Sequence, residues 1–219
     1  MKIERKYVAR DGFRVPCIFL VPPGADSAAV VIHGYGGCKE EPLGLAWRIA
    51  ESGVAACTLD LRGHGEHEMP LDEHLNDDLE AVIDHCRNFG RITAIGHSLG
   101  GRLALISSAD HSIGISPAYL KEYSTQTYET IRNARDYRTR SKYPGQIFDI
   151  LRDLPVWQPK PGKEDMVIYG SRDIPEIRAA CEGVRDQMQV LVVEKALHND
   201  IFMLEATYGA IIKQLSDWR

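Results

Sequence analysis

The sequence predicts an α/β protein with a mainly parallel β-sheet and helices on both of its faces. Short apolar runs alternate with segments of helical periodicity along the chain, which is the pattern that β-α-β units produce. Several of these runs consist almost entirely of Val, Ile and Ala, as expected for strands that are covered on both faces. The predicted strands span residues 16–21, 28–33, 54–60, 91–96, 112–116, 165–170 and 189–194.

The segments around these strands complete the predicted architecture. The first 20 residues indicate an antiparallel hairpin that turns at Asp11-Gly12. A helix over residues 75–88 would place its apolar residues, from Leu79 to Cys86, along one stripe. The other predicted helices span residues 42–52, 99–107 and 200–218, and one more begins at Pro175.

Length and composition restrict the possible classes of function. At 219 residues, with 44% hydrophobic and 26% charged residues, the chain is predicted to form one globular domain over residues 1–219. A net charge of −5 gives no indication of a nucleic-acid partner. The first ten residues are charged where a secretory signal would be apolar, and no apolar run approaches the roughly 20 residues of a membrane span. We therefore expect no membrane span and a cytoplasmic location.

The sequence gives no strong indication of a metal or a cofactor, and we expect neither. The five cysteines are an odd number without metal-like pairing, so no disulfide framework is predicted. His64, Glu66, His67 and Glu68 crowd one glycine-rich loop, but two histidines three residues apart in a loop lack the fixed spacing that would aim both at one ion. We interpret this loop as structural. The oligomeric state, a homodimer included, is not fixed by these residues.

Residues 117–160 break the alternation and are predicted to be an insertion that forms a small helical cap. The segment holds seven of the 17 aromatic residues, and eight Lys or Arg against five Asp or Glu. Residues Tyr128 to Tyr137 show helical spacing within it. A long insertion beside a catalytic site favours a pocket-lining role. The alternative is a helical excursion that only packs against the body.

A G-x-S-x-G pattern, Gly96-His97-Ser98-Leu99-Gly100, lies between a predicted strand and a predicted helix. A serine hydroxyl becomes a nucleophile when a sharp strand-to-helix turn holds it beside a base and at a helix N-terminus. Glycines suit such a turn because the backbone there is strained and crowded. The pattern and its placement together predict Ser98 as a catalytic nucleophile.

Chain order selects the base that would activate Ser98. In this type of fold an acid and then a histidine follow the nucleophile. Only two of the eight histidines, His111 and His198, lie beyond Ser98, and only His198 also follows a later strand-to-loop junction. We therefore predict His198 as the base, and interpret His33 and His97 as residues that brace neighbouring loops.

The acid should lie at the end of the preceding strand, because catalytic groups of parallel sheets collect at the carboxyl ends of strands. Asp173 fits this position and would hold the imidazole in the tautomer that accepts the serine proton. Asp165 lies at the wrong end of the strand, Asp186 lies in a predicted helix, and Glu194 lies in or at the end of the last strand.

Acyl transfer also requires donors for the negative charge that develops on the substrate carbonyl oxygen. One predicted donor is the backbone N–H of Leu99, which follows the nucleophile at the start of a helix. The second is the N–H of Tyr35, in the glycine-rich loop of residues 33–37 after a buried strand. These two amides form the predicted oxyanion hole.

The quoted motifs resemble those of the α/β-hydrolase superfamily. The segments 33–37, 60–65 (Asp-Leu-Arg-Gly-His-Gly), 96–100 and 170–173, and then His198, occur in the family's order and cover nearly the whole chain except the insertion. The chain looks most like the small carboxylesterases and acylglycerol-lipase-like hydrolases, including the cinnamoyl or feruloyl esterase group. The resemblance implies an eight-stranded sheet, a triad of Ser98, Asp173 and His198, and an oxyanion hole of the Tyr35 and Leu99 amides. Many relatives place glycine before the catalytic histidine, where this chain has Leu197.

These observations predict a serine hydrolase that cleaves carboxylic esters through an acyl-enzyme, with a small-molecule ester as its partner. The aromatic-rich insertion favours small to medium apolar or aromatic acyl groups. The same triad serves several substrates, so a thioesterase or a small serine peptidase is the alternative activity. A non-catalytic hydrolase-like binding protein is the alternative from another class, but such proteins are expected to lose triad members, and all three are present here.

Overall fold

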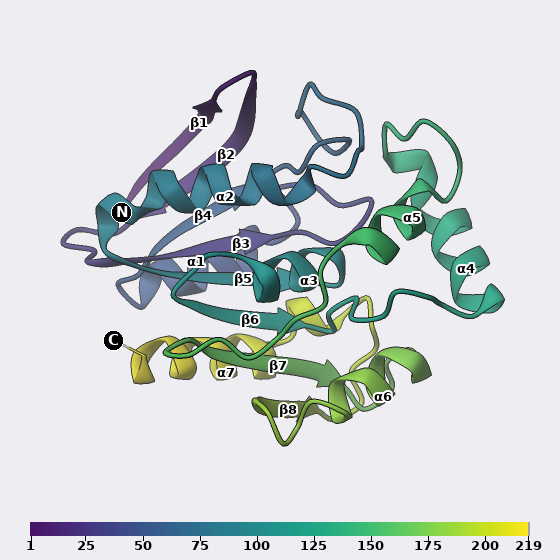
Figure 1. Ribbon diagram of the computed structural model, residues 1–219. Helices are drawn as coiled ribbons and strands as arrows, with labels where there is room; N and C mark the ends of the chain where they lie inside the picture. The colour runs from purple at the N-terminus through teal and green to yellow at the C-terminus, as the bar shows by residue number, and fades with distance from the viewer. Residues whose placement is uncertain (219) are drawn as a thin grey trace.

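A single eight-stranded sheet forms the centre of the computed structural model, which describes residues 1–218 (Figure 1). The strand order is β1-β2-β4-β3-β5-β6-β7-β8. β2 pairs antiparallel with both β1 and β4, and every other pair is parallel. The strands are β1 (Lys2–Arg10), β2 (Phe13–Val21), β3 (Ser27–Ile32), β4 (Ala55–Leu59), β5 (Arg91–His97), β6 (His111–Ile115), β7 (Glu164–Gly170) and β8 (Gln189–Val193).

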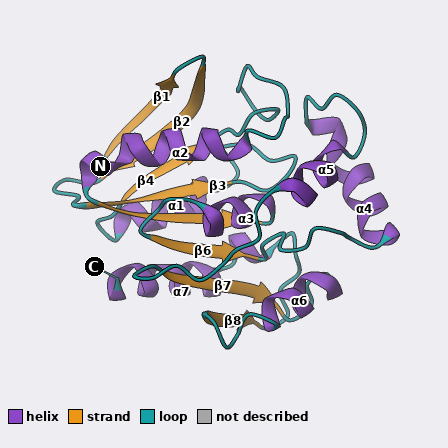
Figure 2. Ribbon diagram, in the orientation of Figure 1, coloured by secondary structure: helices purple, strands orange, loops and turns teal. Residues whose placement is uncertain are grey.

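Helices cover both faces of the sheet (Figure 2), because successive strand residues point to opposite sides. In β3, for example, Val30 and Ile32 pack with α2 and α3, whereas Val31 packs on the other face with α1 and α7. The α6 helix packs against β7. The helices of the body are α1 (Leu43–Glu51), α2 (Leu75–Cys86), α3 (Leu99–Ile106), α6 (Pro175–Glu182) and α7 (Glu205–Asp217).

The structure confirms the predicted sheet and corrects one helix. The seven predicted strands are present, the hairpin turns at Asp11-Gly12, and α6 begins at Pro175. The predicted start of the last helix at residue 200 is wrong. Asp200 accepts a hydrogen bond from the Leu197 amide, a 3₁₀ turn follows at Ile201–Met203, and Leu204 is extended, so α7 begins only at Glu205.

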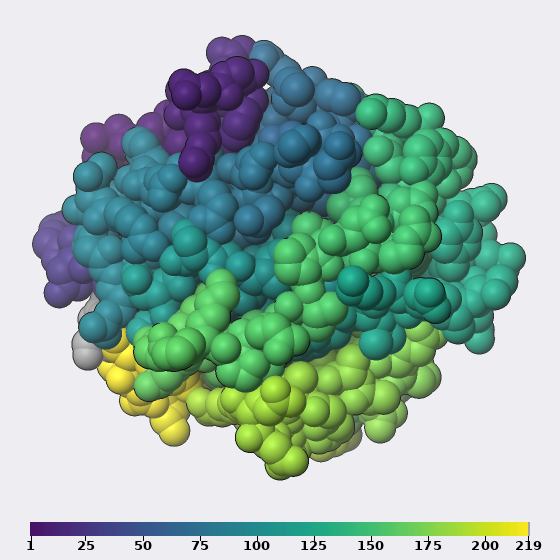
Figure 3. All heavy atoms as spheres, in the orientation of Figure 1, coloured from purple at the N-terminus to yellow at the C-terminus, as the bar shows by residue number. Residues whose placement is uncertain are grey.

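The insertion forms two helices, α4 (Thr125–Arg135) and α5 (Gln146–Asp153), beyond the carboxyl ends of the parallel strands (Figure 1). In Figure 3 the atoms that follow α5, drawn in green, form a band between the N-terminal half and the C-terminal strands. Among residues 1–218, no helix has the length and apolar composition that crossing a membrane requires.

A buried arginine of α3 holds both ends of the insertion. Arg102 is fully buried. Its Nη1 donates to the carbonyl oxygens of Ala118, at 3.0 Å, and Tyr119 near the start of the insertion, and its Nη2 and Nε donate to those of Leu154 and Pro155, at 3.0 Å and 2.9 Å, near the end. The helix that follows Ser98 therefore also anchors the insertion.

Candidate active site

Ser98 lies in a strained turn between β5 and α3. Its φ of 52° is in the left-handed region, which residues other than glycine rarely adopt. The backbone is crowded there, because a Cβ on Gly96 would lie 2.1 Å from the Gly100 carbonyl oxygen. The expectation that the flanking glycines avoid a collision is confirmed. Ser98 N–H donates to the Ile115 carbonyl at 2.9 Å, which fixes the turn to the neighbouring strand.

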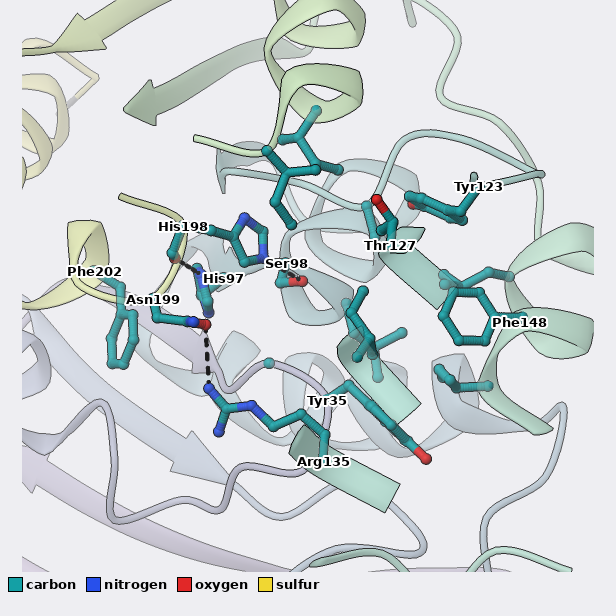
Figure 4. A pocket seen from close by; sticks show the side chains of 18 of the residues that line it. Tyr35, His97, Ser98, Tyr123, Thr127, Arg135, Phe148, His198, Asn199 and Phe202 are labelled. Carbon is teal, nitrogen blue, oxygen red and sulfur yellow. Dashed lines mark hydrogen bonds between the residues drawn. The ribbon is translucent and has the colours of Figure 1, made fainter. Parts of the chain in front are cut away.

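Ser98, His198 and Asp173 lie in one chain of hydrogen bonds, although they come from three separate loops. His198 Nε2 is 3.1 Å from Ser98 Oγ (Figure 4), and His198 Nδ1 is 2.7 Å from Asp173 Oδ1. A carboxylate only accepts hydrogen bonds, so Nδ1 carries the proton and Nε2 is left to accept the serine proton. The arrangement can therefore transfer a proton from Ser98 to His198.

The Asp173 carboxylate is buried, and both of its oxygens accept hydrogen bonds. Oδ1 also accepts the Ile174 N–H at 2.7 Å, and Oδ2 accepts the hydroxyl of Ser116. Burial raises the pKa of the Asp173 carboxyl, but the hydrogen bond and charge of His198 and these two donors outweigh it, so the pKa lies below its ordinary value. Ser116 was not among the predicted site residues. It could have been found from its position directly after β6, because this strand lies between the strands that carry Ser98 and Asp173.

The loop that carries His198 has its left-handed backbone conformation at Lys195 and not at Leu197, so a side chain fits at position 197. Lys195 has the positive φ of this loop, 65°, and Leu197 does not lie in that region. The Leu197 N–H then donates to Asp200 Oδ1 at 2.8 Å, which closes the turn around His198. A glycine before the histidine is therefore not required by this backbone.

His97 and His33 brace loops, as predicted. His97 Nε2 donates to the His198 carbonyl oxygen at 2.7 Å. His33 Nδ1 donates to the Gly34 carbonyl at 2.7 Å, and its Nε2 accepts the Leu61 N–H at 3.2 Å. Burial lowers the pKa of His97 to about 3 and that of His33 to about 4, so both rings are neutral at pH 7.

The two predicted oxyanion-hole residues lie on the wall of one cavity with Ser98. Leu99 begins α3, where the first N–H groups have no partner within the helix. Tyr35 follows β3, and the Gly37 N–H donates to the Gly34 carbonyl at 3.0 Å to close the loop. The Tyr35 hydroxyl points away from Ser98 and donates to Asp136 Oδ1 at 2.8 Å, so this loop also holds the end of α4.

The other candidates considered from the sequence lie away from Ser98. Asp165 is at the opposite end of β7, where it accepts the Trp157 indole N–H at 2.7 Å. Asp186 and Glu194 are exposed, and His111 is at the start of β6, at the amino end of that strand. Among the titratable candidates, only His198 contacts Ser98, and only Asp173 contacts His198 through its side chain.

The crowded loop of residues 64–68 is held by ion pairs and backbone contacts. Glu66 lies 3.1 Å from the buried Lys39 ammonium, which also donates to Asp60 at 2.8 Å. His64 Nδ1 contacts the Arg62 carbonyl at 2.9 Å. In the described part of the chain, no group of three or more His, Cys, Asp or Glu side chains is arranged to hold a metal ion.

The cavity above Ser98 contains about 710 Å³ of space free of protein atoms, its open mouth included. Body residues line one side, and the prediction that the insertion lines the cavity is confirmed. Tyr123 and Phe148 lie on one side of Ser98, and Arg135 and Asn199 lie on another (Figure 4). The insertion contributes Ala118, Tyr123, Thr127, Ile131, Arg135, Ile147, Phe148 and Leu151.

Comparison with solved structures shows which proteins share this architecture. Est1E from Butyrivibrio proteoclasticus, solved with ferulic acid, has a TM-score of 0.73 at 18% identity over 97% of both chains. A hyperthermophilic esterase from the archaeon Pyrobaculum calidifontis has a TM-score of 0.70 at 18% identity, over 98% of this chain and 84% of the esterase. A thioesterase domain from the curacin biosynthetic pathway has a TM-score of 0.67 at 15% identity, over 97% of this chain and 99% of that domain.

At these identities the likeness establishes the fold and not the activity. No curated protein matches the sequence. The family model described as alpha/beta hydrolase family matches residues 29–201, which include the turn at Ser98, the Asp173 loop and His198. Because this match spans most of the chain, the protein belongs to the alpha/beta hydrolase family.

Proposed function

We propose that the protein is a serine esterase that hydrolyses carboxylic esters through an acyl-enzyme. Ser98 is the nucleophile, His198 is the general base and acid, and Asp173 orients His198 and stabilises its charged form. The backbone N–H groups of Tyr35 and Leu99 form the oxyanion hole. The whole chain, residues 1–219, acts as one α/β-hydrolase domain, with residues 117–160 as its cap.

In acylation, His198 Nε2 takes the hydroxyl proton as Ser98 Oγ bonds to the ester carbonyl carbon. The carbonyl π electrons move to the oxygen, and the Tyr35 and Leu99 amides bind the resulting oxyanion. When the carbonyl re-forms, the bond to the alcohol oxygen breaks and that oxygen takes the proton from His198. The alcohol leaves, and the acyl group stays on Ser98.

In deacylation, a water molecule takes the place of the alcohol. His198 removes its proton as its oxygen bonds to the acyl carbon, the same two amides bind the second oxyanion, and Ser98 Oγ leaves with the proton from His198. The carboxylic acid is released and the enzyme returns to its starting state. These steps use the side chains of Ser98, His198 and Asp173, the backbone amides of Tyr35 and Leu99, and water.

The observation that carries this proposal is the pair of hydrogen bonds that joins Ser98 to His198 and His198 to Asp173, at the floor of a mainly apolar cavity. Ile147, Phe148 and Leu151 of the cap supply much of its apolar wall. An apolar or aromatic acyl group of small to medium size suits such a wall, because binding there removes apolar surface from water.

The test is a panel of p-nitrophenyl esters from acetate to long-chain and hydroxycinnamoyl acids, assayed with the wild type and Ser98→Ala. We expect turnover of medium apolar or aromatic esters, and a loss of about 10⁴-fold or more in the variant. Ser108→Ala, at an exposed serine after α3, is the control and should keep full activity. Equal turnover by Ser98→Ala and the wild type would refute the proposal, and a preference for acetate alone would refute the predicted selectivity.

A further inference from the structure

Arg135, the last residue of α4, extends from the cap toward the loop that carries His198. Its guanidinium Nη2 donates to the side-chain oxygen of Asn199 at 3.2 Å, and Asn199 directly follows His198 (Figure 4). The side chain lines the same cavity as Ser98 and is partly buried. A permanent positive charge therefore lies beside the catalytic histidine, within a mainly apolar site.

The charge of Arg135 is not balanced by a carboxylate in the described structure. Among the cavity-lining residues it is the only Lys or Arg, and Glu41 is the only Asp or Glu. Glu41 is already paired with Arg138, at 2.9 Å. Within residues 1–218, no ion pair includes Arg135, and its side-chain partner Asn199 is neutral.

The position of Arg135 is set by contacts on both sides. Gly36, with a φ of +70°, lies against it so closely that a Cβ there would be 3.0 Å from the Arg135 Cβ. The next residue, Asp136, accepts the hydroxyl of Tyr35 at 2.8 Å and the Gly145 N–H at 2.7 Å. The glycine-rich loop of residues 33–37 therefore holds the end of α4, and with it the Cβ of Arg135.

Guanidinium chemistry indicates what this residue can bind. Its planar fork of N–H donors matches the paired oxygens of a carboxylate or phosphate, and only one of its nitrogens is engaged by Asn199. Because His198 must protonate the leaving oxygen, the alcohol arm of a bound ester has to pass the His198-Asn199 segment. The aromatic rings of Tyr123 and Phe148 lie on another side of Ser98 (Figure 4).

Building on the proposed esterase function, we propose that Arg135 binds an anionic group, a carboxylate or a phosphate, on the leaving-alcohol arm of the substrate. The apolar acyl arm then occupies the cavity beneath the cap. The substrates of this class are esters of an apolar or aromatic acid with an alcohol that carries a negative charge. The competing explanation is that Arg135 and Asn199 only hold the cap to the body.

Three hexanoyl esters of phenols with different para substituents test the proposal. The substituents are a carboxylate, its neutral methyl ester and a phosphate, so the comparison covers both anionic groups and one uncharged reference. The kcat/KM of each anionic ester is divided by that of the methyl ester, for the wild type, Arg135→Met and Arg132→Met. This ratio cancels any loss that is common to all esters.

Arg135→Met should lower the anionic-to-neutral ratio about ten- to one-hundredfold, the range expected for a hydrogen bond to a charged group. Arg132, an exposed cation on the same helix, is the matched control, and Arg132→Met should leave the ratio within about twofold, as expected for a screened surface charge. The anion whose ratio falls further in Arg135→Met is the group that Arg135 recognises. A ratio that is equal in wild type and Arg135→Met would show that the arginine only holds the cap, and would overturn the proposal.

A second pair of esters tests the placement of the anion. p-Nitrophenyl hemiglutarate carries a carboxylate on its acyl arm, and p-nitrophenyl 5-methylhexanoate is its neutral isostere. If only this pair responds to Arg135→Met, the anion belongs to the acyl arm and the placement proposed here is wrong.

Binding of 4-hydroxybenzoate to Ser98→Ala, measured by calorimetry, separates this proposal from the esterase function. We expect at least about tenfold weaker binding when Arg135→Met is added. If the wild type turns over no ester but this difference is found, the esterase proposal fails and the anion site stands. Equal binding of 4-hydroxybenzoate by both proteins, together with equal binding of 4-hydroxyphenyl phosphate, overturns the anion site.

Discussion

The loops at the carboxyl edge of the sheet and the insertion of residues 117–160 form two walls of one cavity, but they are held in different ways. The edge loops are fixed by a dense set of contacts, such as those of Asp173 with His198, Ser116 and Ile174. In α4, by contrast, Thr127 is the only buried residue. The insertion is instead held at separate points along its length, by Arg102 at its two ends, by Tyr35 and Glu176 at α4, and by the Leu71 carbonyl at α5.

This difference separates chemistry from selectivity. The groups that would break the ester bond come from the tightly packed body, and most of the groups that would contact an apolar acyl arm come from the insertion. Changes in the body should therefore affect all esters alike, and changes in the insertion should affect one ester relative to another.

The largest effect is expected from Asp173→Ala. His198 would lose the carboxylate that holds its Nδ1–H and stabilises its charged form, so kcat/KM should fall about 10⁴-fold for every ester. Initial rates on p-nitrophenyl butyrate and acetate measure this loss. Asp186→Ala, at an exposed carboxylate, is the control and should be fully active. A loss for only one of the two esters would contradict the assignment of chemistry to the body and of selectivity to the insertion.

Arg102→Leu should give the next largest effect, on stability. Removing the guanidinium leaves the carbonyls of Ala118 and Leu154, among others, without their donor in a buried region. The free energy of unfolding should fall by about 3 kcal/mol, as expected when several buried acceptors lose their partners. Urea unfolding measures it. A loss no larger than that of Arg152→Leu, whose contacts are with the exposed Asp149 and Asp153, would show that Arg102 does not anchor the insertion.

Acid should destabilise the body through three buried histidines. Burial lowers the pKa of His33 to about 4, and those of His64 and His97 to about 3, whereas the unfolded chain titrates near pH 6.5. Below that pH the unfolded state binds more protons, so stability is full above pH 6.5 and is lost progressively toward pH 4. The insertion contains no histidine.

Each of these histidines should contribute a slope of at most about 1.4 kcal/mol per pH unit between the two pKa values. Urea unfolding at pH 7 and pH 5 measures the slope, which should be shallower in His64→Gln and unchanged in His74→Gln, because His74 is exposed. A wild-type stability that does not change between these two pH values would contradict the prediction.

The smallest effect is expected from Phe148→Ala in the cap. Phe148 lines the cavity and packs on Tyr123 and Tyr128. Its removal should lower kcat/KM for a phenylpropionyl ester relative to acetate by about tenfold, or about 1.4 kcal/mol, a part of the free energy of burying one aromatic ring. Tyr143→Ala, at an exposed aromatic residue of the same insertion that does not line the cavity, is the control. An equal loss on both esters would assign Phe148 to the chemistry rather than to selectivity.

The fold of the body could be predicted from the sequence because it is marked by short local patterns that follow one another in a fixed order. Apolar runs mark the strands, and chain order leaves one histidine beyond Ser98 at a strand-to-loop junction. The positions of Ser98, Asp173 and His198 at one edge follow from parallel pairing, since the carboxyl ends of parallel strands lie together. Their catalytic roles stay a prediction.

The remaining features depend on contacts between distant segments, which no local pattern encodes. Ser116 meets Asp173 across 57 residues, and Tyr35 meets Asp136 across 101. The four carbonyl groups that accept hydrogen bonds from Arg102 come from the two ends of the insertion, which meet only in the folded protein. The contact of Arg135 with Asn199 likewise requires the cap to be folded over the site.

The most direct test of the account is covalent labelling of Ser98 by a fluorophosphonate. The tryptic peptide that spans residues 92–102 contains Ser98 as its only serine, so mass spectrometry can locate the adduct. We predict one phosphonate per chain on this peptide, formed at least about 10³-fold more slowly in His198→Ala, which has lost the base. A folded wild-type protein that takes up no phosphonate, or that takes it up on another residue, would contradict the assignment of Ser98 as the nucleophile.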